Sequence, residues 1–316
     1  MTRTAFDQPI VFFGMGSYLS RSVLAHLISN GWNIQAIVRA ISPYTKNKPP
    51  NFFRFHEGLA KKIQALLDTL SSPIDQSPLL HLAHKNKIDY VEVWDVNHPS
   101  MQAFLKSVEP ELILIVNFTH LLSAETLRIP SNTIINVHPS LLPNYRGPSP
   151  LFWMMKKGET DFGVTIHLVD DKEDHGDILY QEKFSIPVGI TFQELDHTIT
   201  NMVVNNIETI LQNVFDKTLT CFPQTAVQQT RHSRPQYDDF ALDTSLPANK
   251  VFTFITSMHS VYQLFVKINQ EKFEIEKPIA YELDSVFPYD YFLQGDSLVF
   301  RCNPGSVEVK LKSAPS

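Results

Sequence analysis

Apolar residues near the start of the chain follow two periods in turn, which predicts a strand, a helix and a second strand. Residues 10–13 form a short apolar run, typical of a buried strand. Apolar residues then recur at helical spacing over 19–28, and Asn30 and Gly31 provide a stop signal. A second apolar run covers 34–38. This βαβ opening predicts a parallel sheet.

The same two periods recur further along the chain and extend the sheet. Helices are predicted over residues 57–70, 79–85 and 99–107, and strands over 90–93, 112–116, 133–137, 165–169 and 178–180. Thr191 and Glu194 form a capping box, which predicts the start of a long amphipathic helix. We therefore expect an α/β fold, with an open, mostly parallel sheet and helices on both of its faces.

The apolar pattern is interrupted by a polar stretch near residue 224. We predict an α/β domain over 1–223, a linker over 224–234 and a small β domain over 235–316. Short alternating runs at 262–268, 272–275, 297–301 and 307–311 indicate the strands of that last domain.

Composition and charge narrow the class of protein. Apolar residues make up 43% and charged residues 19% of the 316 positions, as in ordinary globular proteins. The two cysteines support neither a disulfide framework nor a zinc site, and we predict no metal. No secretion signal or membrane-length apolar run is present, so we expect a cytoplasmic protein without a membrane partner. The net charge of −6 gives no general attraction to nucleic acid.

Candidate chemistry begins at the end of the strand predicted over 133–137. Asn136 and His138 stand two positions apart, so in a strand their side chains face the same side. Turn residues follow at once, including Pro139, Pro143 and Gly147. Polar groups at the point where a strand gives way to a loop are where open α/β sheets place their sites.

The surrounding motif resembles the folate-dependent formyltransferase family, whose members include methionyl-tRNA formyltransferase and amino-sugar N-formyltransferases. The chain contains Asn-x-His, then Ser-Leu-Leu-Pro and Arg-Gly within residues 136–147. Asp174, in an Asp-His-Gly sequence, stands 36 residues after His138. By this resemblance, Asn136, His138 and Asp174 correspond to the family's catalytic trio. It also implies that the C-terminal domain is barrel-like.

The residue types suit the chemistry that the resemblance implies, which is transfer of a formyl group from 10-formyltetrahydrofolate to an amine. An amide donor (Asn136) and an imidazolium (His138) can stabilise the oxyanion that builds on the formyl oxygen. An acidic neighbour favours the charged form of a nearby histidine. Asp174 can also take the ammonium proton and pass it to the leaving nitrogen.

Binding residues are expected around this trio. The folate is expected to lie between the segment after strand 112–116 and the loop 170–174, with contacts from Asn117, Phe118, Leu121, Asp170, Asp171 and Asp174. The amine substrate is expected to contact Gly14, Gly16, Ser17, Ser140, Arg146 and Gly147. The turn 14–17 has two interpretations: a strand-to-helix turn that needs small residues, or a cradle for an anionic part of the substrate.

The acceptor amine is the open question. The residues from Arg231 onward include nine Lys/Arg and eleven Asp/Glu, whereas a surface that grips a tRNA acceptor stem should be basic. We therefore favour a small amine, such as a nucleotide-linked amino sugar, over methionyl-tRNA. The remaining alternatives are a 10-formyltetrahydrofolate hydrolase, a non-catalytic folate-binding module and a dinucleotide-dependent oxidoreductase. For the last, position 19 is Leu and the second strand is followed by Arg39, where a glycine and an acid are expected.

Overall fold

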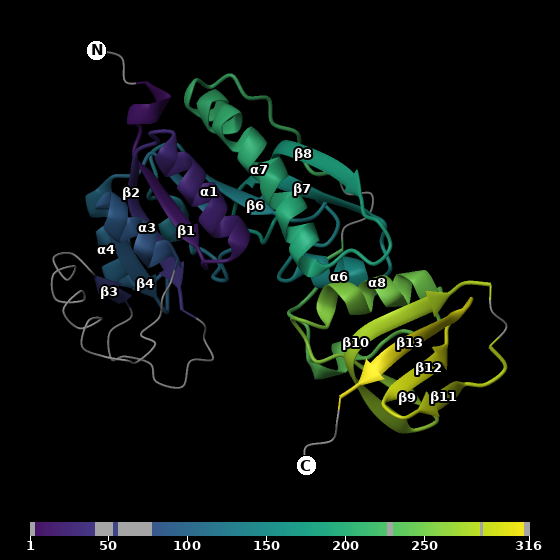
Figure 1. Ribbon diagram of the computed structural model, residues 1–316. Coiled ribbons are helices and arrows are strands. Elements are labelled where there is room, and N and C mark those ends of the chain that lie inside the picture. The colour runs from purple at the N-terminus through teal and green to yellow at the C-terminus, as the bar shows by residue number, and fades with distance from the viewer. Residues whose placement is uncertain (1–3, 42–52, 56–77, 226–229, 285–286, 313–316) are drawn as a thin grey trace. The chain divides into compact units, whose positions relative to one another are not determined.

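The computed structural model of the chain describes residues 4–41, 53–55, 78–225, 230–284 and 287–312 (Figure 1). The helix predicted over 57–70 lies outside these residues. The chain divides into two compact units. The first unit comprises Met1–His138, Val164–Glu182 and Ile199–Val227, and the second unit comprises Pro139–Gly163, Lys183–Thr198 and Gln228–Ser316. The units interleave along the sequence, and the boundaries 1–223, 224–234 and 235–316 stay a prediction.

An eight-stranded sheet runs in the order β3-β4-β2-β1-β5-β6-β7-β8. Its strands are β1 (Ile10–Gly14), β2 (Ile34–Ala40), β3 (Phe53–Phe55), β4 (Asp89–Val93), β5 (Leu112–Val116), β6 (Thr133–His138), β7 (Asp161–Leu168) and β8 (Ile178–Ser185). The five central strands from β4 to β6 pair in parallel, whereas β3 is antiparallel to β4 and β7 is antiparallel to β6. The mostly parallel sheet predicted from the sequence is therefore confirmed.

Several of the described helices begin at a side chain that caps them. The described helices up to Phe215 are η1 (Ala5–Asp7), α1 (Tyr18–Ser29), α3 (Pro78–Asn86), α4 (Pro99–Val108), α5 (Ala124–Leu127), α6 (Pro150–Lys156) and α7 (Phe192–Phe215). The Ser17 hydroxyl caps α1 by accepting from the Ser20 amide, 3.2 Å away. The capping box before α7 is present: Thr191 N donates to Glu194 Oε2, and Glu194 N donates to Thr191 Oγ1. In the part of the chain that the structure describes, no helix is long and apolar enough to cross a membrane.

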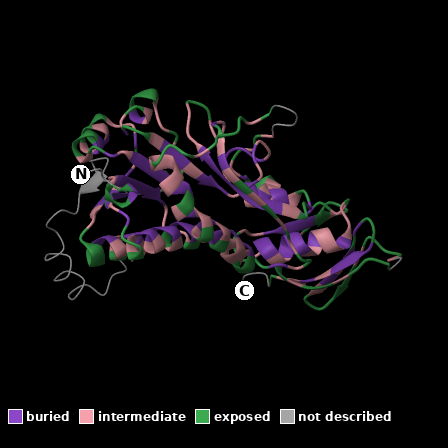
Figure 2. Ribbon diagram, turned by 90° about the horizontal axis from the view of Figure 1, so that it is seen from above, coloured by how far each residue is buried: buried purple, intermediate pink, exposed green. Residues whose placement is uncertain are grey.

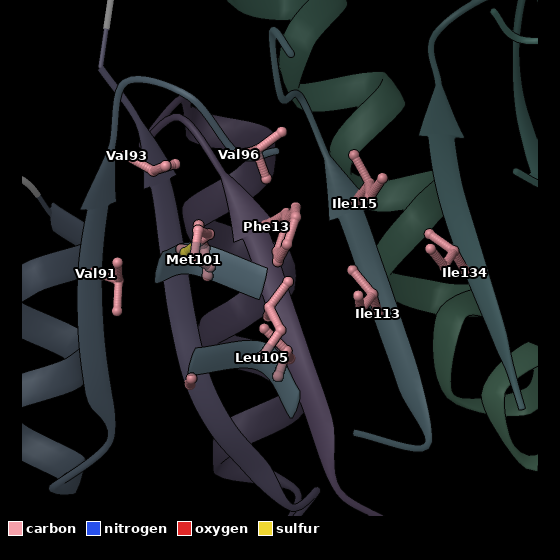
Figure 3. Packing of buried hydrophobic residues seen from close by; sticks show 12 residues of the cluster. Phe13, Val91, Val93, Val96, Met101, Leu105, Ile113, Ile115 and Ile134 are labelled. Carbon is pink, nitrogen blue, oxygen red and sulfur yellow. The ribbon is translucent and has the colours of Figure 1, made fainter. Parts of the chain in front are cut away.

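The core of the first unit lies on both faces of this sheet. Phe13 of β1 packs with Met101 and Leu105 of α4 in one buried cluster (Figure 3), to which Val11 of β1 also belongs. Successive strand residues point to opposite faces, and α1, which contacts β1 and β5, contributes no member of this cluster. Helices thus cover both faces, as predicted. Every residue of β1 and β5 is buried, which explains their unbroken apolar sequences. Figure 2 shows buried residues in purple along interior strands and exposed residues in green, many of them in loops.

The second unit contains a five-stranded antiparallel sheet that curls as a half-barrel, in the order β11-β12-β13-β10-β9 (Figure 1). Its strands are β9 (Phe265–Ile268), β10 (Glu271–Glu282), β11 (Tyr291–Gln294), β12 (Ser297–Arg301) and β13 (Ser306–Leu311). The helix α8 (Ala248–Met258) contacts β10 and β13, and η2 (Tyr237–Phe240) precedes it. The prediction of a small, barrel-like arrangement of β-strands in the C-terminal region is therefore confirmed.

Several element boundaries in this region differ from the prediction. The strand predicted over 262–268 begins only at Phe265, because Tyr262 still donates its amide to Met258 at the end of α8. The run 272–275 is the start of the twelve-residue β10. The charged residues of β10 lie on exposed positions, so its sequence lacks an apolar signal over most of its length. Both α8 and β11 were missed.

Aromatic residues form the centre of the second unit. The Phe152 side chain of α6 is 2% exposed, and its ring lies 5.0–5.9 Å from those of Phe240, Phe254 and Tyr262. Edge-on aromatic contacts of this kind add to the free energy gained from burial. Phe152 therefore joins α6 to η2, α8 and the segment after α8.

We predict that Phe152→Ala lowers the free energy of unfolding by about 3–5 kcal/mol, because it opens a large cavity in this aromatic centre. Phe292→Ala is the matched control, since Phe292 is 50% exposed and its truncation should change stability by about 0.5 kcal/mol or less. Urea unfolding followed by circular dichroism measures both. Equal effects of the two substitutions would contradict the prediction.

Candidate active site

The candidate site is built on the register between β6 and β7. Asn136 stands directly opposite His167, and His138 stands opposite Thr165. Side chains of directly opposed residues lie on the same face and close together. Asn136 and His138 also share the face of Ile134, a member of the buried cluster under α4. The sequence-based prediction that Asn136 and His138 face the same side is consistent with this register.

Four polar side chains of the first unit meet at this point. The Asn136 Nδ2 atom lies 3.0 Å from His167 Nε2 and 3.2 Å from Asp174 Oδ1. Asp174 Oδ2 lies 3.6 Å from His138 Nδ1, and Asp174 Oδ1 lies 3.6 Å from His167 Nε2. The two imidazoles are nearly inaccessible, with His138 5% and His167 1% exposed. The Asp174 side chain is 13% exposed, so it is the most open of the three charged or titratable groups.

His167 was not among the residues predicted from the sequence, and its tautomer follows from its partners. His167 Nδ1 lies 2.7 Å from the Leu168 carbonyl oxygen, which can only accept. Nδ1 therefore carries the hydrogen, and Nε2 accepts from the Asn136 amide. The Asn136 amide group thus directs one hydrogen to His167 and the other to Asp174. The sequence signal was the alternation of Thr165 and His167 with apolar residues in a strand, which places both on one face.

Asp174 reaches this cluster from the loop that joins β7 and β8. The loop is closed at its base, where Leu168 N donates to Asp177 O at 2.9 Å. Asp174 adopts a left-handed backbone conformation with φ of 50°. A Cβ atom on Gly176 would lie only 2.0 Å from the Leu168 carbonyl oxygen, so no other residue fits without moving the backbone. The Asp-x-Gly motif therefore reflects how tightly this loop turns back over the end of β7.

His175 faces Asp170 rather than the catalytic candidates. Its Nδ1 atom lies 2.7 Å from Asp170 Oδ2, while Asp170 Oδ1 accepts from the Lys172 amide at 2.9 Å. Both side chains of the pair are a little over one-third exposed. The pair joins the two ends of the acidic loop, and Asp171 between them is exposed. The predicted roles of Asp170 and Asp171 in folate binding stay predictions.

The segment after β5 lies against the same cluster as this loop. Phe118 and Leu122 pack on the cluster beneath α4, and so does Val169 at the start of the loop. The Phe118 ring lies 4.9 Å from that of Phe13. Asn117 is left-handed with φ of 58°, and the Leu121 side chain is 64% exposed. The residues predicted to bind folate therefore belong to two segments that converge on one cluster.

The turn between β1 and α1 needs small residues for steric reasons. A Cβ atom on Gly14 would lie 2.2 Å from Ser20 Oγ, and Gly16 has a φ of 82°. The Ser17 hydroxyl is used in capping α1. These observations account for the residue types in this turn, while an additional role of Gly14, Gly16 and Ser17 in binding an anion stays a prediction.

The other predicted substrate residues belong to the second unit. The buried Ser140 donates its hydroxyl to the Asn144 carbonyl at 2.8 Å and so shapes the turn that follows β6. Arg146 is 7% exposed, and its backbone exchanges hydrogen bonds with Thr230 and His232. Gly147 has a φ of 91°. Their contacts with substrate stay predictions.

The described residues contain no group of three or more His, Cys, Asp or Glu side chains arranged to hold a metal ion. The cluster of Asn136, His138, His167 and Asp174 instead resembles a proton-transfer site, in which Asn136 donates to His167 and Asp174. A carboxylate within reach of imidazole and amide groups can hold a proton or accept one. An amide and an imidazole on one side can stabilise a developing negative charge.

Comparisons with known proteins relate part of this chain to formyl transferases. The formyl transferase family model matches residues 67–209, a span that includes Asn136, His138 and Asp174. Over 193 residues the chain is 30% identical to the methionyl-tRNA formyltransferase of Thermotoga sp. (strain RQ2). That alignment covers 61% of this chain and 54% of the relative, so it spans about half of the relative's length.

Solved structures show the same fold over nearly the whole chain. The sugar 3N-formyl transferase WlaRD superposes with a TM-score of 0.67 at 16% identity, covering 98% of this chain and 99% of that one. The N-formyltransferase of Helicobacter canadensis superposes with a TM-score of 0.65 at 17% identity, covering 97% and 99%. Residues 67–209 of this chain are thus similar to the formyl transferase family, and the chain as a whole has the fold of the solved N-formyltransferases.

Proposed function

We propose that this chain transfers a formyl group from 10-formyltetrahydrofolate to the primary amine of a small molecule such as a nucleotide-linked amino sugar. The observation that carries the proposal is the convergence of Asn136, His138 and Asp174 within 3.2–3.6 Å in the first unit. An amide, an imidazole and a carboxylate are the groups that this transfer needs, and the reaction requires no nucleophile from the enzyme.

The reaction proceeds by attack of the acceptor nitrogen on the formyl carbon of the donor. A new C–N bond forms, and negative charge builds on the formyl oxygen. The bond between the formyl carbon and N10 of the folate then breaks. The proton lost by the attacking amine ends on N10, so that the products are a formamide and tetrahydrofolate. Atoms and charge balance without a further reactant.

The side chains divide this chemistry between them. His138, with Asp174 beside its Nδ1 atom, acts as a cation that stabilises the oxyanion. Asp174 takes the proton from the amine and returns it to N10. Asn136 donates to the oxyanion, for which it gives up its hydrogen bond to Asp174. The exchange costs little at that stage, because a protonated Asp174 is a weaker acceptor than the carboxylate.

A folate donor is supported by the solved relatives and by the packing of two apolar residues beside the candidate site. WlaRD was solved with 5-N-formyl-THF and dTDP, and the Helicobacter canadensis enzyme with folinic acid and dTDP-3-aminofucose. In this chain, Phe118 and Val169 are partly buried and pack against the same apolar cluster, next to the loop that carries Asp174. A flat, polar-edged pterin requires apolar contacts with polar groups close by.

Charge distribution supports the small acceptor. Four cations of the second unit each lie within 4.0 Å of a carboxylate, which neutralises their charge locally: Lys267, Lys272, Arg301 and Lys310. Such a surface attracts a polyanion weakly. Methionyl-tRNA is the competing acceptor, since the Thermotoga relative is a methionyl-tRNA formyltransferase.

Hydrolysis of the donor by water is a further alternative, because a water molecule in the place of the amine would use the same cluster. It is distinguished by the product, which is formate instead of a formamide. A non-catalytic module would have no need of the joint burial of His138, His167 and Asp174. For an oxidoreductase, Arg39, near the C-terminal end of β2, is paired with Glu92 at 2.9 Å and offers no carboxylate of its own for a ribose.

We predict that Asn136→Ala lowers kcat/KM by a factor of about 10² to 10³, the usual cost of losing one oxyanion donor. His138→Asn and Asp174→Asn should lose at least as much, because the oxyanion loses its cation and the proton its carrier. These replacements limit the cavity that truncation of such buried side chains would leave. Steady-state kinetics measures the effect, with His84→Ala on the exposed surface of α3 as the control. Near-normal rates in all three variants would refute the assignment.

We predict that 5-formyltetrahydrofolate binds against residues 117–122 and 170–174. The ligand should slow amide hydrogen exchange in peptides that cover these two segments, and should leave the sheet of the second unit unchanged. Leu121→Asp places a charge on the exposed side chain of the first segment and should weaken binding about tenfold or more. Protection confined to residues 265–311 would show that the folate binds elsewhere.

We predict that formylation depends little on salt. A tRNA held through several phosphates would lose affinity with a log–log slope of about −0.7 to −0.9 for each phosphate contacted. The test compares kcat/KM for a panel of nucleotide-linked amino sugars with that for charged initiator tRNA, each across a salt series. Efficient and steeply salt-dependent formylation of tRNA, without turnover of the sugars, would establish the tRNA as the acceptor instead.

A further inference from the structure

The segment that follows α7 lies beside the start of β8. Phe222 and Ile178 exchange backbone hydrogen bonds of 2.9 and 2.8 Å in an antiparallel bridge. Continuing that antiparallel register by two residues brings Gln224 opposite Gly176, in the loop that carries Asp174. This segment belongs to the first unit, as the loop does.

The Gln224 side chain holds the backbone on both sides of His175. Its Nε2 atom donates to the Asp174 carbonyl oxygen at 3.0 Å and to the Gly176 carbonyl oxygen at 2.8 Å. The two hydrogens of one amide group therefore bind two carbonyls of the loop. Asp174 itself has a left-handed backbone conformation with φ of 50°, and contacts to its peptide group help to hold it there.

Two different residues thus fix the two ends of Asp174. Asn136 donates to the Oδ1 atom and orients the carboxylate, whereas Gln224 donates to the main-chain carbonyl and fixes the Cα position from which the carboxylate projects. Gly176 can approach Leu168 closely only while the loop keeps this path. Loss of the Gln224 amide would remove one hydrogen bond from each of these two carbonyls and would let the loop backbone move more freely.

We propose that Gln224 is a positioning residue for Asp174, which acts through the loop backbone and not by contact with substrate. The proposal rests on the proposed function, because it assigns Gln224 to the same proton-transfer step. The placement of a catalytic group by about 1 Å can change a rate by about 10². Gln224 should therefore affect turnover through Asp174 and should have no effect where Asp174 no longer acts.

The test compares Gln224→Met with Gln263→Met. Both replacements keep the length of the side chain and remove an amide that donates to two main-chain carbonyls. Gln263 donates to Leu264 and Ile275, which belong to the second unit. Gln224→Met should lower kcat by about 10- to 100-fold, with a smaller change in KM for the formyl donor. Gln263→Met should leave kcat within about twofold of wild type.

A double-mutant cycle separates positioning from a general structural effect. In the Asp174→Asn background, Gln224→Met should cost less than about twofold further, because the group it positions has already been disabled. Losses that multiply in the double variant would overturn the proposal. A kcat unchanged by Gln224→Met in the wild-type background would also overturn it.

Hydrogen exchange tests the same contact without any turnover. Amides in peptides covering residues 168–178 should exchange faster in Gln224→Met than in wild type or Gln263→Met. Unchanged exchange there would overturn the proposal. Failure of the wild-type chain to formylate any amine would overturn only the proposed function, since the exchange comparison still decides whether Gln224 holds this loop.

Discussion

The candidate site depends on the hydrogen bonds of one amide group. Asn136 Nδ2 lies between His167 on the neighbouring strand and Asp174 on the following loop, at 3.0 and 3.2 Å. The first bond is set by the register of β6 and β7, and the second requires the loop to return over the end of β7. If β7 shifted by one residue relative to β6, its side chains would change faces, and His167 would no longer lie beside Asn136. Strand pairing and the arrangement of the chemical groups are therefore one constraint.

The antiparallel direction of β7 determines which residues stand beside Asn136. A parallel sheet extends from β4 to β6, and the loops that follow the C-terminal ends of its strands all lie at one edge. Because β7 runs antiparallel to β6, residues at its C-terminal end stand beside the middle of β6 instead of that edge. His167 thereby reaches Asn136 from the side, and the loop after β7 has to travel back toward His138. Tight closure of the loop at Gly176 follows from that path.

Some residues of the candidate site can be predicted from the sequence, whereas others cannot, for physical reasons. The relation of Asn136 to His138 follows from strand periodicity alone, whereas Asp174 could be selected only through its resemblance to a family motif. His167 was missed because its role depends on which residue of β6 stands opposite it. The sequence of neither strand alone determines that register. Gln224 was missed because its polar surroundings indicated a linker, although its side chain binds the loop. Similarly, the apolar and β-branched sequence of α8 hid a helix among predicted strands.

The close approach of Gly176 to the Leu168 carbonyl also divides the loop into positions that are sterically closed and positions that are open. Gly176 admits no side chain, and Asp174 must keep its left-handed backbone. Asp171 and Lys172, by contrast, project into solvent at the outer bend of the same loop. For protein engineering, diversity can therefore be introduced at 171–172 at low steric cost, whereas a loop grafted from another enzyme must keep both its length and its glycine.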